Sequence, residues 1–271
     1  MLTNSWIYDA IIYTYALSLL FYFSDTVGRN RRAKRMGTGL LVFVWVLQTI
    51  FLVVRIIRHQ DVPIISSFEF MFLFSWLLVT ASLAINRFFS IEYVVFFVNL
   101  VGFALLIINM LNDPTSSSVM AEWEMMHNLL VFHITLAACG FAALTVGAIF
   151  SGMYVFLHHR LKRRQWSEAV RRLPSLERME RMSYFAVIIG IPFFLLSLAV
   201  AIGVVLLGNR IELLTDFKIW FTLIALALYF SYFWVRTRAV LTGLRLALWN
   251  VGCYAFMVLN FSLNSLSAFH R

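Results

Sequence analysis

The side chains in this sequence best suited to chemistry are its histidines, because imidazole is a common ligand of metals and haem iron. There are six, and His133 is the most informative because it lies about seven residues, or roughly 10 Å, inside a long apolar run. A neutral imidazole at that depth needs a partner for each ring nitrogen, and a metal or haem iron supplies one. His127 lies about 240° away around the same helix, so the two cannot share an ion as neighbours on one face.

His270 is the second candidate ligand, because it lies on a separate segment that topology places on the same side of the membrane as His133. Two such histidines could hold a haem from opposite faces, as bis-histidine ligation requires. The alternative is that each is a hydrogen-bonded packing residue. His158 and His159 precede a basic cluster and are typical of the membrane interface, whereas His59 has no predicted role.

Other chemistries find little support. Cys139 and Cys253 are far apart and form no CxxC motif, and Ser151 and Ser231 appear isolated among apolar residues. Asp and Glu lie near the ends of apolar runs rather than at mid-membrane, which argues against an ion-coupled transporter or an intramembrane protease. We therefore expect a protein that is not an enzyme.

The elements that position these residues are membrane spans. Of the 271 residues, 62% are hydrophobic and only 13% are charged, whereas a soluble domain carries about 25% charged residues. The apolar runs are continuous rather than alternating, which excludes a β-barrel. The sequence predicts an all-α, polytopic transmembrane helical bundle forming one integral membrane domain over residues 1–271. Its eight expected spans are 6–24, 37–57, 67–86, 91–111, 126–157, 184–207, 217–235 and 245–264.

The basic residues set the orientation. Of the 22 Lys and Arg residues, 17 fall on one set of connections, which the positive-inside rule assigns to the cytoplasm. Eight spans then place both termini outside, in the plasma membrane of a bacterial cell. The net charge of +9 follows from this topology and does not indicate nucleic-acid binding.

The longest basic connection, 158–183, has two interpretations. Ser175 can cap a short second helix after the break at Pro174, and the segment can lie on anionic lipid headgroups. Alternatively, it is a docking surface for a cytoplasmic protein.

Three stretches resemble the cytochrome c assembly family of haem-handling membrane proteins, and within it the HemX subgroup. They are HNLLVFHITLAACGFAALTVGAIF (127–150), LPSLERMERMSY (173–184) and FSLNSLSAFHR (261–271). Glu69 is similar to the acidic residue that opens the family's third span. The resemblance covers 58–271, with LPSLERMERMSY its most specific part.

The resemblance implies that His133 and His270 are axial ligands of a b-type haem. It also implies a role in haem homeostasis, by modulating the level of glutamyl-tRNA reductase through that enzyme or an adaptor at 158–183. The alternatives are a haem transport or cytochrome c assembly component, and a cofactor-free membrane scaffold.

The chain departs from the family in its haem-presenting loop. The family's tryptophan-rich stretch ending in Asp-Pro-Lys-Glu corresponds to GNRIELLTDFKIW (208–220). This segment keeps only Asp216, Lys218 and Trp220, which the resemblance makes candidate haem-binding residues. The histidine near the inner end of the seventh span is absent, because the equivalent residues are Tyr232, Phe233 and Trp234. These departures favour a protein that holds or senses haem without delivering it to apocytochrome.

Overall fold

The computed structural model describes residues 6–28, 31–58, 67–89, 92–110, 124–165, 167–207 and 216–262, and they are almost entirely α-helical. Eight helices in these ranges are long and apolar enough to cross a membrane, which confirms the predicted all-α bundle. A ninth, short helix lies between two of them. The helices are α1 (Trp6–Gly28), α2 (Arg31–Arg58), α3 (Ser67–Phe89), α4 (Glu92–Met110), α5 (Glu124–Lys162), α6 (Glu168–Arg172), α7 (Leu176–Leu207), α8 (Phe217–Thr237) and α9 (Leu244–Ser262).

The long connection differs from its prediction. Ser175 does cap a helix, accepting a hydrogen bond from the Arg178 amide at 3.3 Å, but that helix is not short. It is the start of α7, which continues through Pro192 into the span and begins eight residues before the predicted position. Residues 176–183 contain no Gly or Pro, so nothing in them ends the helix. The separate short helix is α6, whose N-cap is Ser167.

The chain packs as two compact units, residues 1–117 and 118–271. In the first unit, α1 packs on α2 and α4, and α3 packs on α4. Tyr15 donates a hydrogen bond to Asn99 at 2.9 Å in a fully buried position. Arg55 and Glu69 form an ion pair at 2.7 Å between the end of α2 and the first turn of α3. The single integral membrane domain over residues 1–271 stays a prediction.

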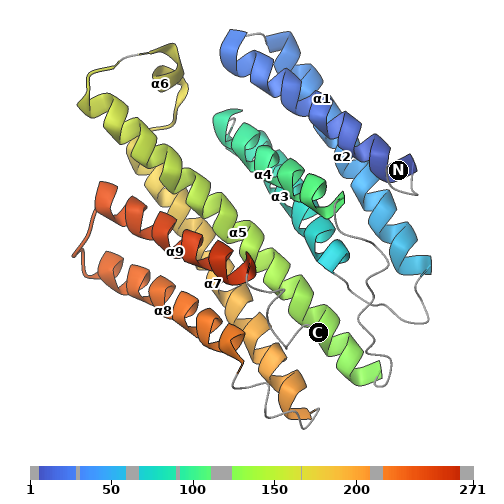
Figure 1. Ribbon diagram of the computed structural model, residues 1–271. Helices are drawn as coiled ribbons and strands as arrows, with labels where there is room; N and C mark the ends of the chain where they lie inside the picture. Colours follow the sequence, from blue (N-terminus) through green and yellow to red (C-terminus); the bar gives the residue numbers. More distant parts are fainter. Residues whose placement is uncertain are drawn as a thin grey trace. The chain divides into compact units, whose positions relative to one another are not determined.

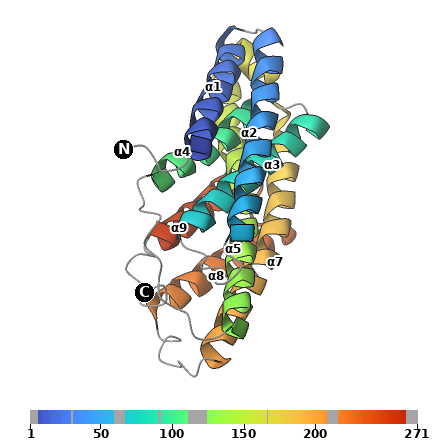
Figure 2. The same ribbon diagram turned by 90° about the vertical axis from the view of Figure 1, so that its right-hand side faces the viewer.

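The second unit is organised around α5 and α7, the two longest helices of the unit, which run antiparallel side by side (Figures 1 and 2). Helix α9 packs on α5, and α8 packs on α9 (Figure 1). At 1.5 Å per residue, the 34-residue apolar span of α5 is about 50 Å long and exceeds the hydrocarbon core of about 30 Å. Helix α5 must therefore tilt or extend beyond the bilayer.

Small residues let α5 and α7 approach closely. A Cβ added at Gly140 would lie 2.9 Å from the Phe194 ring and 3.2 Å from the Gly190 carbonyl oxygen. One added at Gly147 would lie 3.2 Å from the Ala186 Cβ. The facing positions recur every seven residues on both helices, which is the repeat of a left-handed antiparallel pair. They are His133 with Ser197, Gly140 with Gly190, and Gly147 with Ser183.

Substitution of Gly140 by Leu should destabilise the second unit, because its side chain meets the backbone of α7 rather than open space. We expect a loss of about 1–3 kcal/mol, the usual cost of overpacking, measured as a lower thermal unfolding temperature in detergent. Gly152→Leu on the same helix is the control, since a Cβ there meets nothing within 4 Å. Equal losses in both variants would contradict the close approach.

The external location of both termini also stays a prediction. A C-terminal alkaline phosphatase fusion should be active, because this enzyme matures only outside the cytoplasm. A C-terminal green fluorescent protein fusion should be dark, because this protein becomes fluorescent only inside the cytoplasm. Fluorescence of the second fusion would reverse the orientation derived from the Lys and Arg bias.

Candidate functional site

His133 is held against α7 by two hydrogen bonds. Its Nδ1 lies 2.8 Å from the Ser197 carbonyl oxygen and 2.9 Å from the Ser197 Oγ. The same hydroxyl is 2.9 Å from the His133 carbonyl oxygen, to which it donates. Since a carbonyl can only accept, Nδ1 carries the proton and Nε2 carries the lone pair. This is the tautomer in which a histidine ligates iron through Nε2.

His133 lies in the outer part of α5, as the topology assigns it. The helix begins at Glu124, nine residues before His133. The His133 side chain is partly buried. A ring at this position can be reached by an amphipathic ligand that has one polar edge in the headgroup region.

The start of α8 adds charge to this site. Asp216 is the N-cap of α8 and accepts a hydrogen bond from the Lys218 amide at 2.8 Å. Lys218 is partly buried and lies near enough to His133 for its charge to act on the imidazole. Trp220 is 59% exposed. Of the predicted site residues, Lys218 thus interacts electrostatically with His133, while Asp216 acts as a helix cap.

Three of the predicted histidine positions cannot be compared with this site. His270 and His59 lie outside the described residues. The backbone of His127 belongs to α5, but its side chain is outside the described part. Among the residues that are described, no three His, Cys, Asp or Glu side chains group as ligands of a metal ion.

A second polar cluster joins α5, α7 and α9. Asn250 donates from Nδ2 to the Ser151 and Ser183 hydroxyls, both at 2.9 Å, and these hydroxyls are 2.7 Å apart. All three side chains are at most 3% exposed. The interpretation of Ser151 as isolated was therefore wrong, because its partners come from distant segments. Ser231 also has a partner, since the Trp249 indole nitrogen donates to its Oγ at 3.3 Å.

At the inner end of α8, Arg236 follows Tyr232, Phe233 and Trp234, the residues that replace the family's histidine. The Arg236 guanidinium lies 3.5 Å from the centroid of the Tyr184 ring, a cation–π contact. Tyr232 is 1% exposed, and Trp234 is 60% exposed. The described residues at this position therefore form an aromatic and arginine contact rather than a histidine site.

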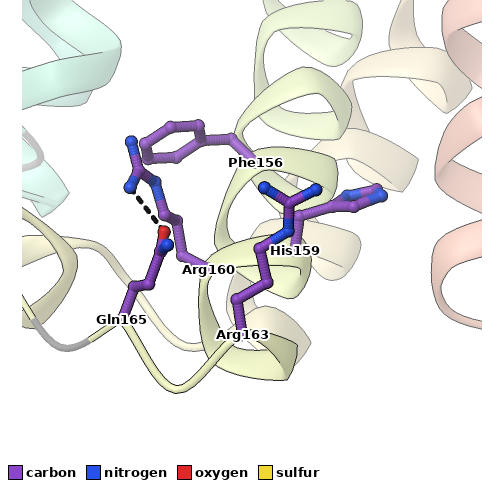
Figure 3. Close-up of a pocket in the computed structure, with 5 residues that line it drawn as sticks. All are labelled: Phe156, His159, Arg160, Arg163 and Gln165. Carbon is purple, nitrogen blue, oxygen red and sulfur yellow. Dashed lines mark hydrogen bonds between the residues drawn. The ribbon is translucent and has the colours of Figure 1, made fainter.

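A basic pocket of about 420 Å³ lies at the end of α5, around residues 156–165 (Figure 3). It belongs to the basic connection whose two interpretations the sequence left open.

Sequence reasoning missed the two residues that organise these sites, Ser197 and Asn250. Both are polar residues within apolar helices, which is the signal that could have found them. Ser197 lies 64 positions from His133 and Asn250 lies 99 from Ser151, so no local pattern connects either residue with its partner.

The helices and spans define a multi-pass membrane protein whose candidate site is a histidine near one membrane surface. The family model described as cytochrome c assembly protein matches residues 40–270, and the chain belongs to this family. Membership implies an involvement with haem, and the family is not a known class of enzymes.

Two curated relatives align over nearly their whole length. Protein HemX of Brevibacillus brevis is 38% identical over 267 residues, which cover 98% of this chain and 97% of the relative. Protein HemX of Bacillus subtilis (strain 168) is 34% identical over 265 residues, covering 97% and 95%. No solved structure matches the chain. The chain is thus a multi-pass bacterial membrane protein similar to HemX proteins.

Replacing Asn250 by Ala should destabilise the second unit by about 1–2 kcal/mol, because it removes hydrogen bonds between three helices inside an apolar environment. Thermal unfolding in detergent measures the loss. Ser262→Ala on the same helix is the control, since its exposed hydroxyl donates to the Val258 carbonyl of its own helix. No difference between the two variants would show that the cluster does not stabilise the unit.

Proposed function

We propose that this protein is a non-enzymatic haem-binding protein that uses His133 as an axial ligand and acts in haem homeostasis. The observation that carries the proposal is the hydrogen bond from His133 Nδ1 to the Ser197 carbonyl. Ligand histidines commonly donate their second ring nitrogen to a carbonyl, because this fixes the ring and makes the ligating nitrogen more basic.

The residues around His133 suit the rest of a haem. A b-type haem has two carboxylates, and Lys218 near the imidazole is a suitable cation for one of them. The position of His133 on an apolar helix, near the end that the topology assigns to the outside, suits an apolar macrocycle with a polar edge. His270 is the proposed second axial ligand, and Asp216 and Trp220 complete the proposed surroundings. When bound, haem would supply an iron ligated by the protein, and the ligation and oxidation state of this iron would report on the supply of haem.

The proposed biological role is regulation rather than delivery. The segment 208–220 lacks the tryptophan-rich platform that presents haem in other family members, so transfer to apocytochrome is the less favoured alternative. We infer that the protein lowers the level of glutamyl-tRNA reductase, through that enzyme or an adaptor at 158–183. The remaining alternative is a membrane scaffold that performs this regulation without a cofactor.

Haem binding is tested by the visible spectrum of the purified protein, oxidised and reduced, after addition of haem. Wild type should give a sharp low-spin spectrum, because two histidines would occupy both axial positions. His133→Ala and His270→Ala should each turn it high-spin or lose haem. Lys218→Gln should keep the low-spin spectrum but weaken haem binding by about three- to tenfold, because it removes only a carboxylate contact.

His158→Ala is the matched control, since His158 lies at the opposite end of α5 and stacks on Tyr154. Its spectrum should equal that of wild type. A protein that takes up no haem, or a His133→Ala spectrum that matches wild type, would remove His133 from the site.

The regulatory role has a separate test. Cells that lack the gene should contain more glutamyl-tRNA reductase, and His133→Ala should fail to restore the low level if haem is part of the signal. Full restoration by His133→Ala would favour the cofactor-free scaffold.

A further inference from the structure

The basic pocket at the end of α5 is lined by Phe156, His159, Arg160, Arg163 and Gln165. These residues do not belong to the His133 site, which is at the other end of the helix. The first four are spaced i, i+3, i+4 and i+7, so the end of α5 and the turn that continues it present them on one face. In Figure 3 the two arginine side chains extend from the last turn back along the helix toward Phe156.

Two contacts hold Arg160 in position. Its Nη1 donates to the Gln165 Oε1 at 2.7 Å, and its guanidinium lies 5.2 Å from the centroid of the Phe156 ring. The turn after the helix brings Gln165 back toward Arg160, because the backbone N–H of Gln165 donates to the Arg160 backbone carbonyl at 3.0 Å. The Arg160 side chain is therefore oriented by the fold even though it is exposed.

The pocket has an excess of positive charge. Among the described residues, its lining contains two arginines and a histidine and no Asp or Glu. Like charges held together repel one another, and an anion placed between them removes this repulsion and forms charge-assisted hydrogen bonds. An arginine guanidinium is well suited to phosphate, which it can contact through two parallel hydrogen bonds.

The pocket is also at the level of lipid headgroups. Helix α5 ends at Lys162 after the basic residues His158 to Arg160, and the Lys and Arg bias assigns this end to the cytoplasmic surface. Phe156 is 47% exposed about one turn deeper, where acyl chains begin. An aromatic side chain above two arginines matches a molecule with an apolar part and a phosphate, rather than a fully soluble anion.

We propose that this pocket binds the phosphate of an anionic phospholipid from the cytoplasmic leaflet, with Arg160 and Arg163 on the phosphate and Phe156 against the start of the acyl chains. This is one defined binding site, which differs from the general attraction between basic segments and anionic lipid. It is independent of haem, so it stands or fails separately from the proposed function.

Native mass spectrometry of the delipidated, full-length protein tests this site by titration with phosphatidylglycerol and phosphatidylcholine of the same acyl chains. The first bound phosphatidylglycerol should bind at least about tenfold more tightly than phosphatidylcholine. Arg160→Gln with Arg163→Gln should remove this preference, because both charge-assisted hydrogen bonds to the phosphate are lost. Gln165→Ala keeps both charges but releases Arg160, and should weaken binding by about two- to fivefold.

The control is Arg164→Gln with Arg171→Gln, which removes the same charge from the same connection without touching the pocket lining. It should keep the preference within about twofold. An equal loss in the control would show diffuse attraction and overturn the site, as would equal affinity for the two lipids. Displacement of phosphatidylglycerol by millimolar inorganic phosphate would also overturn it, by assigning the pocket to a soluble anion.

Discussion

The close approach of α5 to α7 is the constraint on which the second unit depends. Without side chains at Gly140 and Gly190, the two backbones come near enough for the Ser197 carbonyl to reach the His133 ring. Apolar helices in a bilayer gain little from the hydrophobic effect when they associate, so close packing and hydrogen bonds must hold them together. The seven-residue repeat supplies both, because one face of α5 carries the histidine and the glycines in register with their partners on α7. Larger residues at the glycines would separate the helices and remove the support of the imidazole.

The polar side chains of this pair fall at two levels. Near the outer end, as the topology assigns it, Ser197 fixes the tautomer of His133. Toward the inner end, Asn250 of α9 joins the Ser151 and Ser183 hydroxyls. Hydrogen bonds of this kind fix which helix faces pair and in which register, because a displaced register would leave buried polar groups without partners. The same contacts that hold the unit together therefore also orient the proposed ligand.

The two ends of α5 differ in their chemistry. One end carries a histidine supported by a carbonyl, with a partly buried lysine nearby. The other ends in arginines around a pocket whose described lining residues include no carboxylate. The proposed haem site and the proposed lipid site thus lie on one helix that packs along its length against α7. If haem binding altered the packing of α5 on α7, the change would reach the basic connection that joins these two helices directly.

The sequence by itself determined the all-helical class, the eight spans and the concentration of basic residues on one set of connections. These properties are local, since about 20 consecutive apolar residues must form a helix in a bilayer to satisfy their own backbone hydrogen bonds. The prominence of His133 could also be predicted, because a titratable group in an apolar run is rare. Only the tertiary structure decided that Ser197 supports His133, that the charge of Lys218 acts on it, that Asp216 caps a helix, and that Ser151 has partners. Each of these contacts joins different helices or depends on the exact start of one, and no periodicity along the chain encodes which helices become neighbours.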